Sequence, residues 1–220
     1  MKKLILGWMI LATCAASTSA LGFAVGARGG GSASWLFGTT ADAMSTSLKE
    51  RGAGAVSPQT YFSYSVDIFG RLVIVDWFAV QMECGFGPVG GALLASHGID
   101  FLEGVTGNEL HLPILAVFLF RTPIGTFSLE GGAFAAVMLG NPTFIQNDGL
   151  VWSGAGLPVP FLSGGLAVGV GYELKLGPGS VVLDLRYTHR LFSMIDPVTL
   201  GGEGLTPLAV NLSAGYMFSF

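Results

Sequence analysis

Five charged residues of the sequence could form one buried cluster. Each lies in a stretch where apolar residues alternate with small or polar ones: Glu83, Glu130, Glu173, Asp184 and Arg186. Side chains alternate between the two faces of a β-strand, and all five fall on the polar face of their stretch. An unpaired buried charge is costly, so such groups pair with opposite charges. We expect a structural charge network in which Arg186 is the central cation, contacting Glu130 or Glu173 and also Glu83. An ion path or a binding site is the alternative reading of the same charges.

Other chemistry has weaker support in the sequence. His189 and Ser193, with Asp196 nearby, could be compared with lipid-modifying barrel enzymes, but their spacing matches no catalytic motif. His111 is expected to be a hydrogen-bonded filler. The sequence has no CxxC motif or His/Cys cluster that would hold a metal ion. We therefore expect no catalytic residues, no metal and no cofactor.

The element that must position Glu173, Asp184 and Arg186 is a long β-hairpin. Residues 162–176 alternate, and the alternation resumes at Val181 after Gly177-Pro178-Gly179-Ser180, a type II turn signature. One face of the hairpin is apolar, and the other is glycine, alanine or charged. Small residues suit a crowded concave interior better than a solvated surface. Long strands with an apolar exterior and a small, polar interior are typical of a transmembrane β-barrel.

Seven connections join the alternating segments, and their lengths alternate between long and short. Short periplasmic turns and longer extracellular loops are the pattern of bacterial outer-membrane barrels, which have an even number of strands. The predicted fold class is all-β, an eight-stranded antiparallel up-and-down transmembrane β-barrel. Its expected strands are 21–28, 61–69, 77–86, 109–120, 127–137, 162–176, 181–191 and 208–220.

Composition supports an exported membrane protein of this kind. Mean hydropathy is +0.64, yet no stretch is long and apolar enough to predict a spanning helix. Lys2-Lys3, an apolar core and Thr18-Ser19-Ala20 read as a secretory signal cut after Ala20. Lipidation at Cys14 is the alternative. The predicted division is a signal peptide over 1–20 and a barrel over 21–220. The net charge of −4 argues against nucleic acid as a partner.

The C-terminal segment carries aromatic residues at alternate positions, Tyr216, Phe218 and Phe220. It resembles the signal that outer-membrane barrels present to their assembly machinery. Residues 109–115 (ELHLPIL) and 128–132 (SLEGG) resemble the core motif of the PorT-type outer-membrane β-barrel domain. Segments 171–174 and 183–187 resemble the last hairpin of that family. This resemblance spans roughly residues 60–220 and implies architecture more than activity.

The predicted function is that of a non-enzymatic integral protein of the bacterial outer membrane. Its partners would be outer-membrane lipid, the assembly machinery during biogenesis, and an envelope or extracellular partner. The four long loops expected to meet that partner are 29–58, 87–107, 140–160 and 193–206. A narrow channel or a secretion and transport accessory is the alternative, and a lipid-modifying enzyme at the rim is a third reading.

Overall fold

The computed structural model describes residues 21–37, 45–46, 49, 55–96, 100–146, 151–153, 162–191 and 206–220. The strands in this part of the chain are β1 (Gly22–Phe37), β2 (Ala55–Gln59), β3 (Tyr61–Val75), β4 (Phe78–Ser96), β5 (Asp100–Thr122), β6 (Gly125–Gln146), β7 (Val151–Ser153), β8 (Leu162–Leu176), β9 (Gly179–Arg190) and β10 (Thr206–Ser219). Within these described ranges, no helix is both long and apolar enough to cross a membrane.

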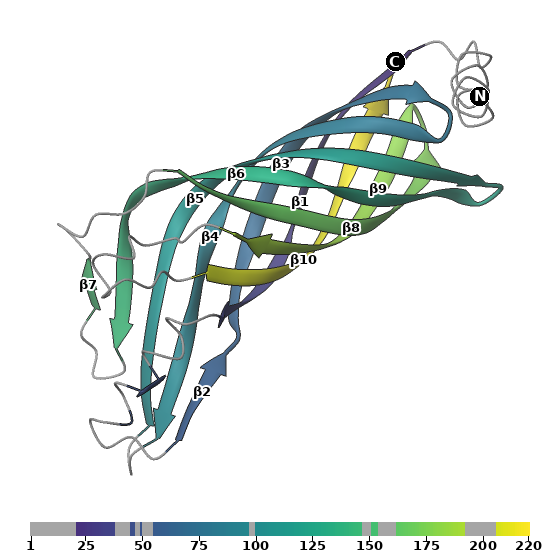
Figure 1. The fold of residues 1–220 in the computed structure, drawn as a ribbon. Coiled ribbons are helices and arrows are strands. Elements are labelled where there is room, and N and C mark those ends of the chain that lie inside the picture. Colours follow the sequence, from purple (N-terminus) through teal and green to yellow (C-terminus); the bar gives the residue numbers. More distant parts are fainter. Residues whose placement is uncertain are drawn as a thin grey trace, which may run out of the picture.

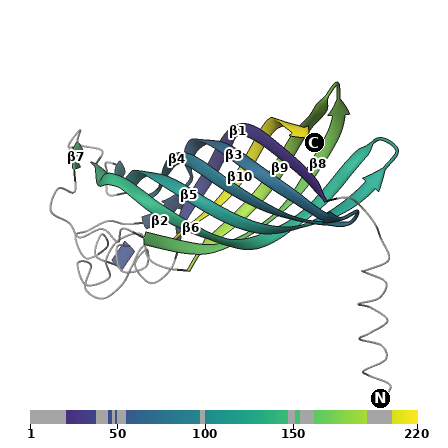
Figure 2. The same ribbon diagram turned by 90° about the horizontal axis from the view of Figure 1, so that it is seen from above.

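Eight of these strands close into an antiparallel barrel. The order around the wall is β1, β3, β4, β5, β6, β8, β9 and β10, and β10 pairs with β1. Short strand β2 adds to β4, and β7 adds to β6. Figure 2 shows the barrel strands tilting across its axis. The predicted fold class, an eight-stranded up-and-down barrel, is confirmed.

Three two-residue turns lie at the same end of the barrel as the C-terminus, and β2 and β7 lie at the opposite end (Figure 1). We call these the turn end and the loop end. The turn after β8 differs from its predicted type. Positive φ (64°) is found at Gly177, its first central residue, whereas a type II turn needs it at the second. Leu176 pairs with Gly179, so the hairpin closes one residue earlier than expected.

Two predicted loops are partly strand. Residues 29–37 continue β1, and 55–59 form β2, so the predicted loop 29–58 was too long. Residues 87–96 and 100–107 extend β4 and β5, so the predicted loop 87–107 was wrong over most of its length. Glycine and proline disfavour strands locally. Here pairing along a whole neighbouring strand outweighs that preference.

The other two predicted loops are only partly described. Residues 140–146 belong to β6 and 151–153 form β7, which shortens the predicted loop 140–160. Most of the predicted loop 193–206 lies outside the described residues, although Thr206 already belongs to β10. The predicted signal peptide 1–20, with its alternatives at Ala20 and Cys14, also lies outside them.

Strand faces follow the predicted alternation. Large apolar side chains point outward on every barrel strand, with Phe62 77% exposed and Ile68 64% exposed. Small apolar clusters fill the interior toward the turn end: one has Ala79, Leu115, Val117, Leu119 and Ala167, the other Ala24, Phe69, Val182 and Met217. Trp77 also belongs to the exterior. It lies in the turn before β4 and stacks on Phe118.

Inward glycines let neighbouring strands approach closely. A Cβ added at Gly132 would press on the carbonyl oxygen of Ile114 and lie 2.9 Å from the Cα of Leu115. The preceding residue, Gly131, points outward, and a Cβ there would meet nothing within 4 Å. The small inward residues of the sequence therefore reflect a crowded interior wall.

Candidate functional site

The interior charges gather around Glu83 on β4. Its Oε2 accepts hydrogen bonds from Arg28 Nη2 at 2.7 Å and from Arg186 Nη1 at 2.6 Å, and its Oε1 accepts one from Gln81 Nε2 at 2.5 Å. The Glu83 side chain has no solvent exposure. This carboxylate therefore holds two guanidinium groups, Arg28 from β1, two strands away in the wall, and Arg186 from β9 on the opposite side.

Arg186 links three carboxylates. Besides Glu83, its Nη2 donates to Glu130 Oε2 at 2.6 Å and lies 3.5 Å from Asp184 Oδ1. Arg28 reaches the same Asp184 oxygen at 3.5 Å. Of the partners expected for Arg186, the structure brings Glu130 and Glu83 to it.

Glu173, the alternative partner expected for Arg186, contacts a different arginine. Glu173 forms an ion pair with Arg71 of β3, whose Nη2 also lies 3.8 Å from Glu130 Oε1. Arg71 Nε donates to Gln81 Oε1 at 2.7 Å. Sequence reasoning missed Arg71 because residues 70–76 were read as a connection. The alternation of Phe69, Arg71 and Val73 was the signal that could have found it.

A second set of polar pairs lies toward the loop end. His111 Nε2 and Asp67 Oδ1 are 2.7 Å apart, and Asp67 Oδ2 lies 3.6 Å from Arg28 Nε. Arg190 Nη2 donates to both oxygens of Glu109, at 2.9 and 2.7 Å. These contacts join β1, β3, β5 and β9 across the lumen. His111 thus has a carboxylate partner within the network.

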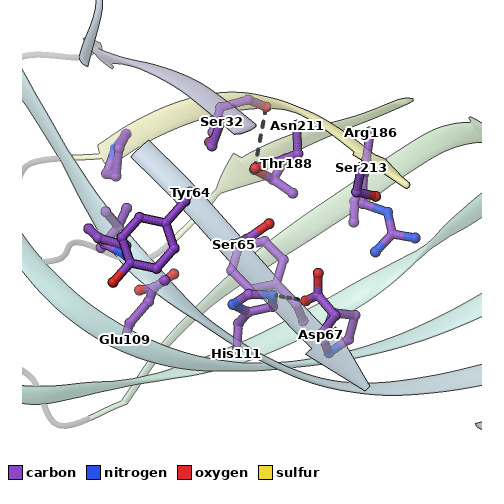
Figure 3. A pocket seen from close by; sticks show the side chains of 18 of the residues that line it. Ser32, Tyr64, Ser65, Asp67, Glu109, His111, Arg186, Thr188, Asn211 and Ser213 are labelled. Carbon is purple, nitrogen blue, oxygen red and sulfur yellow. Dashed lines mark hydrogen bonds and ion pairs between the residues drawn. The ribbon is translucent and has the colours of Figure 1, made fainter. Parts of the chain in front are cut away.

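Buried, ion-paired side chains lie in the interior of the barrel, and two cavities adjoin them. The charge column comprises the ion-paired residues Arg28, Asp67, Arg71, Glu83, Glu130, Glu173, Asp184 and Arg186, all less than about one-eighth exposed at the side chain. A cavity of about 710 Å³ lies at the turn end, with Arg71 and Glu173 in its wall. The other, which we call the outer cavity, has about 90 Å³ of space for water and reaches from Arg186 toward the loop end. Figure 3 shows its polar lining with the Asp67–His111 pair.

No group of three His, Cys, Asp or Glu side chains in the described residues could hold a metal ion. His189 lies on the exterior face, where its ring stacks on Tyr187. Ser193 and Asp196 lie outside the described part of the chain.

The C-terminal aromatic residues lie on the exterior of β10. Phe218 is 47% exposed, and Phe220 is 81% exposed. Tyr216 packs edge-on against Phe218, and its hydroxyl donates to the carbonyl of Leu176 at 2.6 Å. The backbone N–H of Phe220 donates to Phe23 O at 2.8 Å and so continues the contact between the last and first strands.

These features define a closed β-barrel with an apolar exterior and an ion-paired interior. No protein-family model matches the chain, so the resemblance to the PorT-type family stays a prediction, and none of the curated proteins matches it either.

Solved structures of three bacterial proteins are similar in fold. One is the attachment invasion locus protein Ail of Yersinia pestis, solved with the heparin analogue sucrose octasulfate. It is 15% identical to this chain with a TM-score of 0.41, and the match covers 89% of this chain and 99% of the Ail chain. The outer membrane protein OprG of Pseudomonas aeruginosa is 13% identical with a TM-score of 0.49, covering 91% and 96%. The N-terminal β-barrel domain of OprF from the same organism is 13% identical with a TM-score of 0.40, covering 90% and 97%.

Proposed function

We propose that this chain is an integral protein of the bacterial outer membrane, with a closed lumen and no enzymatic activity. The observation that carries the proposal is the inversion of its surface. Large apolar side chains are exposed on all eight strands of the wall, while arginines and carboxylates are buried inside. Exposing these apolar side chains to water would be unfavourable, whereas they can pack against the hydrocarbon of a bilayer. Closed barrels satisfy every backbone hydrogen bond within a bilayer, and the even strand count is the outer-membrane pattern.

The charge column supports a structural role over transport. An eight-stranded barrel is only wide enough for its own side chains. Here Arg28 and Arg186 both bind Glu83, which ties opposite walls together through the centre of the lumen. A solute crossing the barrel would have to break several buried ion pairs at once. The loop end then becomes the part that meets a partner, with the extended β4–β5 hairpin as its largest strand projection.

Three measurements test this proposal. Membrane fractionation should recover the chain with the outer membrane, and it should migrate differently on gels before and after heating. In planar bilayers it should give no steady single-channel current. A stable nanosiemens-scale conductance would overturn the closed lumen and favour the channel alternative. Recovery in the soluble periplasmic fraction would overturn the membrane assignment itself.

A further inference from the structure

The cavity of about 710 Å³ at the turn end, which we call the turn-end cavity, is walled by residues of seven of the eight barrel strands. That volume lies in the range of about 300–1,000 Å³ that is typical of small-molecule sites. Four of the lining side chains are charged: Arg71, Arg121, Glu173 and Lys175. The short turns of an outer-membrane barrel face the periplasm, so this cavity lies on the side that meets periplasmic solutes.

One side of the turn-end cavity is apolar. Ala24 of β1, Val73 of β3 and Met217 of β10 line it, and these three strands are neighbours in the wall. Ala24 and Met217 also belong to the buried apolar cluster that contains Phe69 and Val182. Removing apolar surface from water contributes about 25 cal/mol per Å². This side of the cavity can therefore hold the apolar body of a ligand.

The opposite side of the turn-end cavity is polar and cationic. Thr126 of β6 is paired with Arg121 of β5 on one side and with Glu173 of β8 on the other. Lys175 lies two positions beyond Glu173 on the same face of β8, and Ser180 of β9 is paired with it. All five residues line the cavity. Four adjacent strands thus place two cations and two hydroxyl groups together close to the turns.

Charge pairing in the turn-end cavity leaves Lys175 without a counterion. Arg71 is buried and forms an ion pair with Glu173. Arg121 Nη1 lies 3.2 Å from Asp76 Oδ1. The side chain of Lys175 makes no ion pair or hydrogen bond within the described chain. The lining therefore carries one positive charge in excess, and a ligand with a single negative charge would balance it.

A carboxylate is the acidic group that fits this side of the cavity. An ionised carboxylate only accepts hydrogen bonds, whereas an ammonium group only donates them and a hydroxyl group can donate one. Hydrogen bonds between ionised partners are also stronger than those between neutral ones. A phosphate monoester carries about −1.5 to −2 charges at pH 7, which exceeds the one charge to be balanced. A cationic ligand would be repelled by Lys175 and Arg121.

We propose that the turn-end cavity is a binding site for a small monocarboxylate with an apolar body, taken up from the periplasm. The carboxylate lies beside Lys175, Thr126 and Ser180, and the apolar body packs on Val73 and Met217. Since Lys175 is exposed, salt weakens the attraction, and the affinity falls as ionic strength rises. This site goes beyond the proposed structural role, and the barrel can be an integral membrane protein without it.

Fluorine NMR of a small probe tests the site. The probe is 4-(trifluoromethyl)phenylacetate, and its neutral match is 4-(trifluoromethyl)phenylacetamide, which has the same apolar body. Each is titrated with the full chain in phosphatidylcholine nanodiscs, which leave both ends of the barrel accessible, and empty nanodiscs give the background. We expect saturable binding of the carboxylate, about tenfold tighter than that of the amide, equivalent to about 1.4 kcal/mol. Equal affinity of the two probes, or no saturable binding above the background, would overturn the proposal.

Lysine variants assign the charge to one residue. Lys175→Gln should weaken binding of the carboxylate about tenfold and leave binding of the amide unchanged. Lys175→Arg should keep the difference between the two probes. Lys49→Gln is the matched control, because Lys49 is also exposed but does not line the cavity. Unchanged affinity of Lys175→Gln for the carboxylate, or an equal loss in Lys49→Gln, would overturn the proposal.

A bulky substitution locates the apolar body. Thr126→Trp should fill part of the cavity and weaken binding of both probes. Leu176→Trp, on the exterior at the same end of the barrel, is the control and should change neither. Unchanged binding of both probes to inserted Thr126→Trp would place the ligand elsewhere and overturn the proposal. If Thr126→Trp does not insert, the lysine variants still decide.

Discussion

Arg186 shows how a buried ion can be essential to a barrel without taking part in chemistry. Its guanidinium lies between Glu83 and Glu130, which come from β4 and β6. Each of these carboxylates would be left in a low-dielectric interior if the arginine were removed. The energetic effect of a substitution here comes from the charges that stay behind more than from the contacts that are lost.

Arg186→Ala should therefore lower the free energy of unfolding by about 3–5 kcal/mol. Arg121→Ala is the control, because Arg121 and its partner Asp76 are more than half exposed and such a pair contributes only about 0–1 kcal/mol. Urea unfolding of both variants in lipid vesicles measures the difference. Equal stability of the two variants would contradict a buried network centred on Arg186.

The sequence could predict which side chains face inward but only part of their pairing. Strand parity placed Arg186 and Glu130 on the same interior face, and these two residues are in contact. Glu173 is inward too, but it binds Arg71. Arg71 was not predicted to face inward, because residues 70–76 at the end of β3 were assigned to a connection. Choosing among several carboxylates within reach of one arginine requires the tilt and curvature of the barrel, which parity alone does not contain.

Neighbouring strands in this wall are held at distances that only glycine allows at certain positions. Gly131 and Gly132 on β6 differ only in the face to which they point. One points into open space outside, and the other points against the backbone of β5. The pair therefore separates the intrinsic effect of adding a methyl group to a strand from the effect of crowding.

Gly132→Ala should destabilise the barrel by about 1–3 kcal/mol, because backbone atoms of Ile114 and Leu115 cannot move as a flexible side chain would. Gly131→Ala should be neutral within experimental error. Thermal or urea unfolding of the two single variants gives the comparison. Destabilisation by Gly131→Ala as large as by Gly132→Ala would contradict the assigned faces.

The exterior of β8 offers a matched test of depth. Val168 and Leu176 point outward with similar exposure, 54% and 58%, but Val168 lies near the middle of the strand and Leu176 at the turn end. Val168→Arg should cost about 2–4 kcal/mol, and Leu176→Arg about 0–1 kcal/mol. Refolding in vesicles measures both. An unchanged stability of Val168→Arg would place that face away from lipid.

Element boundaries at the loop end were harder to predict than those at the turn end. The short turns contain only a few residues, so the end of one strand fixes the start of the next. At the loop end, residues 87–107 are rich in glycine and were read as a loop. Residues 87–96 and 100–107 instead extend β4 and β5, because each strand supplies the other with backbone partners there. Local propensity contains no information on such a partner.

The whole molecule depends on its last residues, because β10 completes the wall. Deleting Phe220 should impair insertion, since its aromatic ring ends the predicted assembly signal and its N–H bonds to Phe23. The measurement is the fraction of chains that show heat-modifiable migration after refolding or export. Ser219→Ala, next to it on β10, is a control that keeps the aromatic residue. Normal migration of the deletion variant would contradict this role.

Closure of the barrel by β1 and β10 sets the order of events during folding. Their register joins residues from opposite ends of the chain, from Ala24↔Ser219 to Phe37↔Thr206. Every other wall pairing joins strands that are neighbours along the barrel sequence and can form while the chain is incomplete. The entropy lost on closing a loop grows only slowly with loop length. The long sequence separation of β1 and β10 therefore adds little to the free-energy cost of pairing them. We expect this pairing to form late, because one edge of β1 has no partner until β10 is present. A chain truncated anywhere before β10 would keep that edge exposed, ready to pair with another copy.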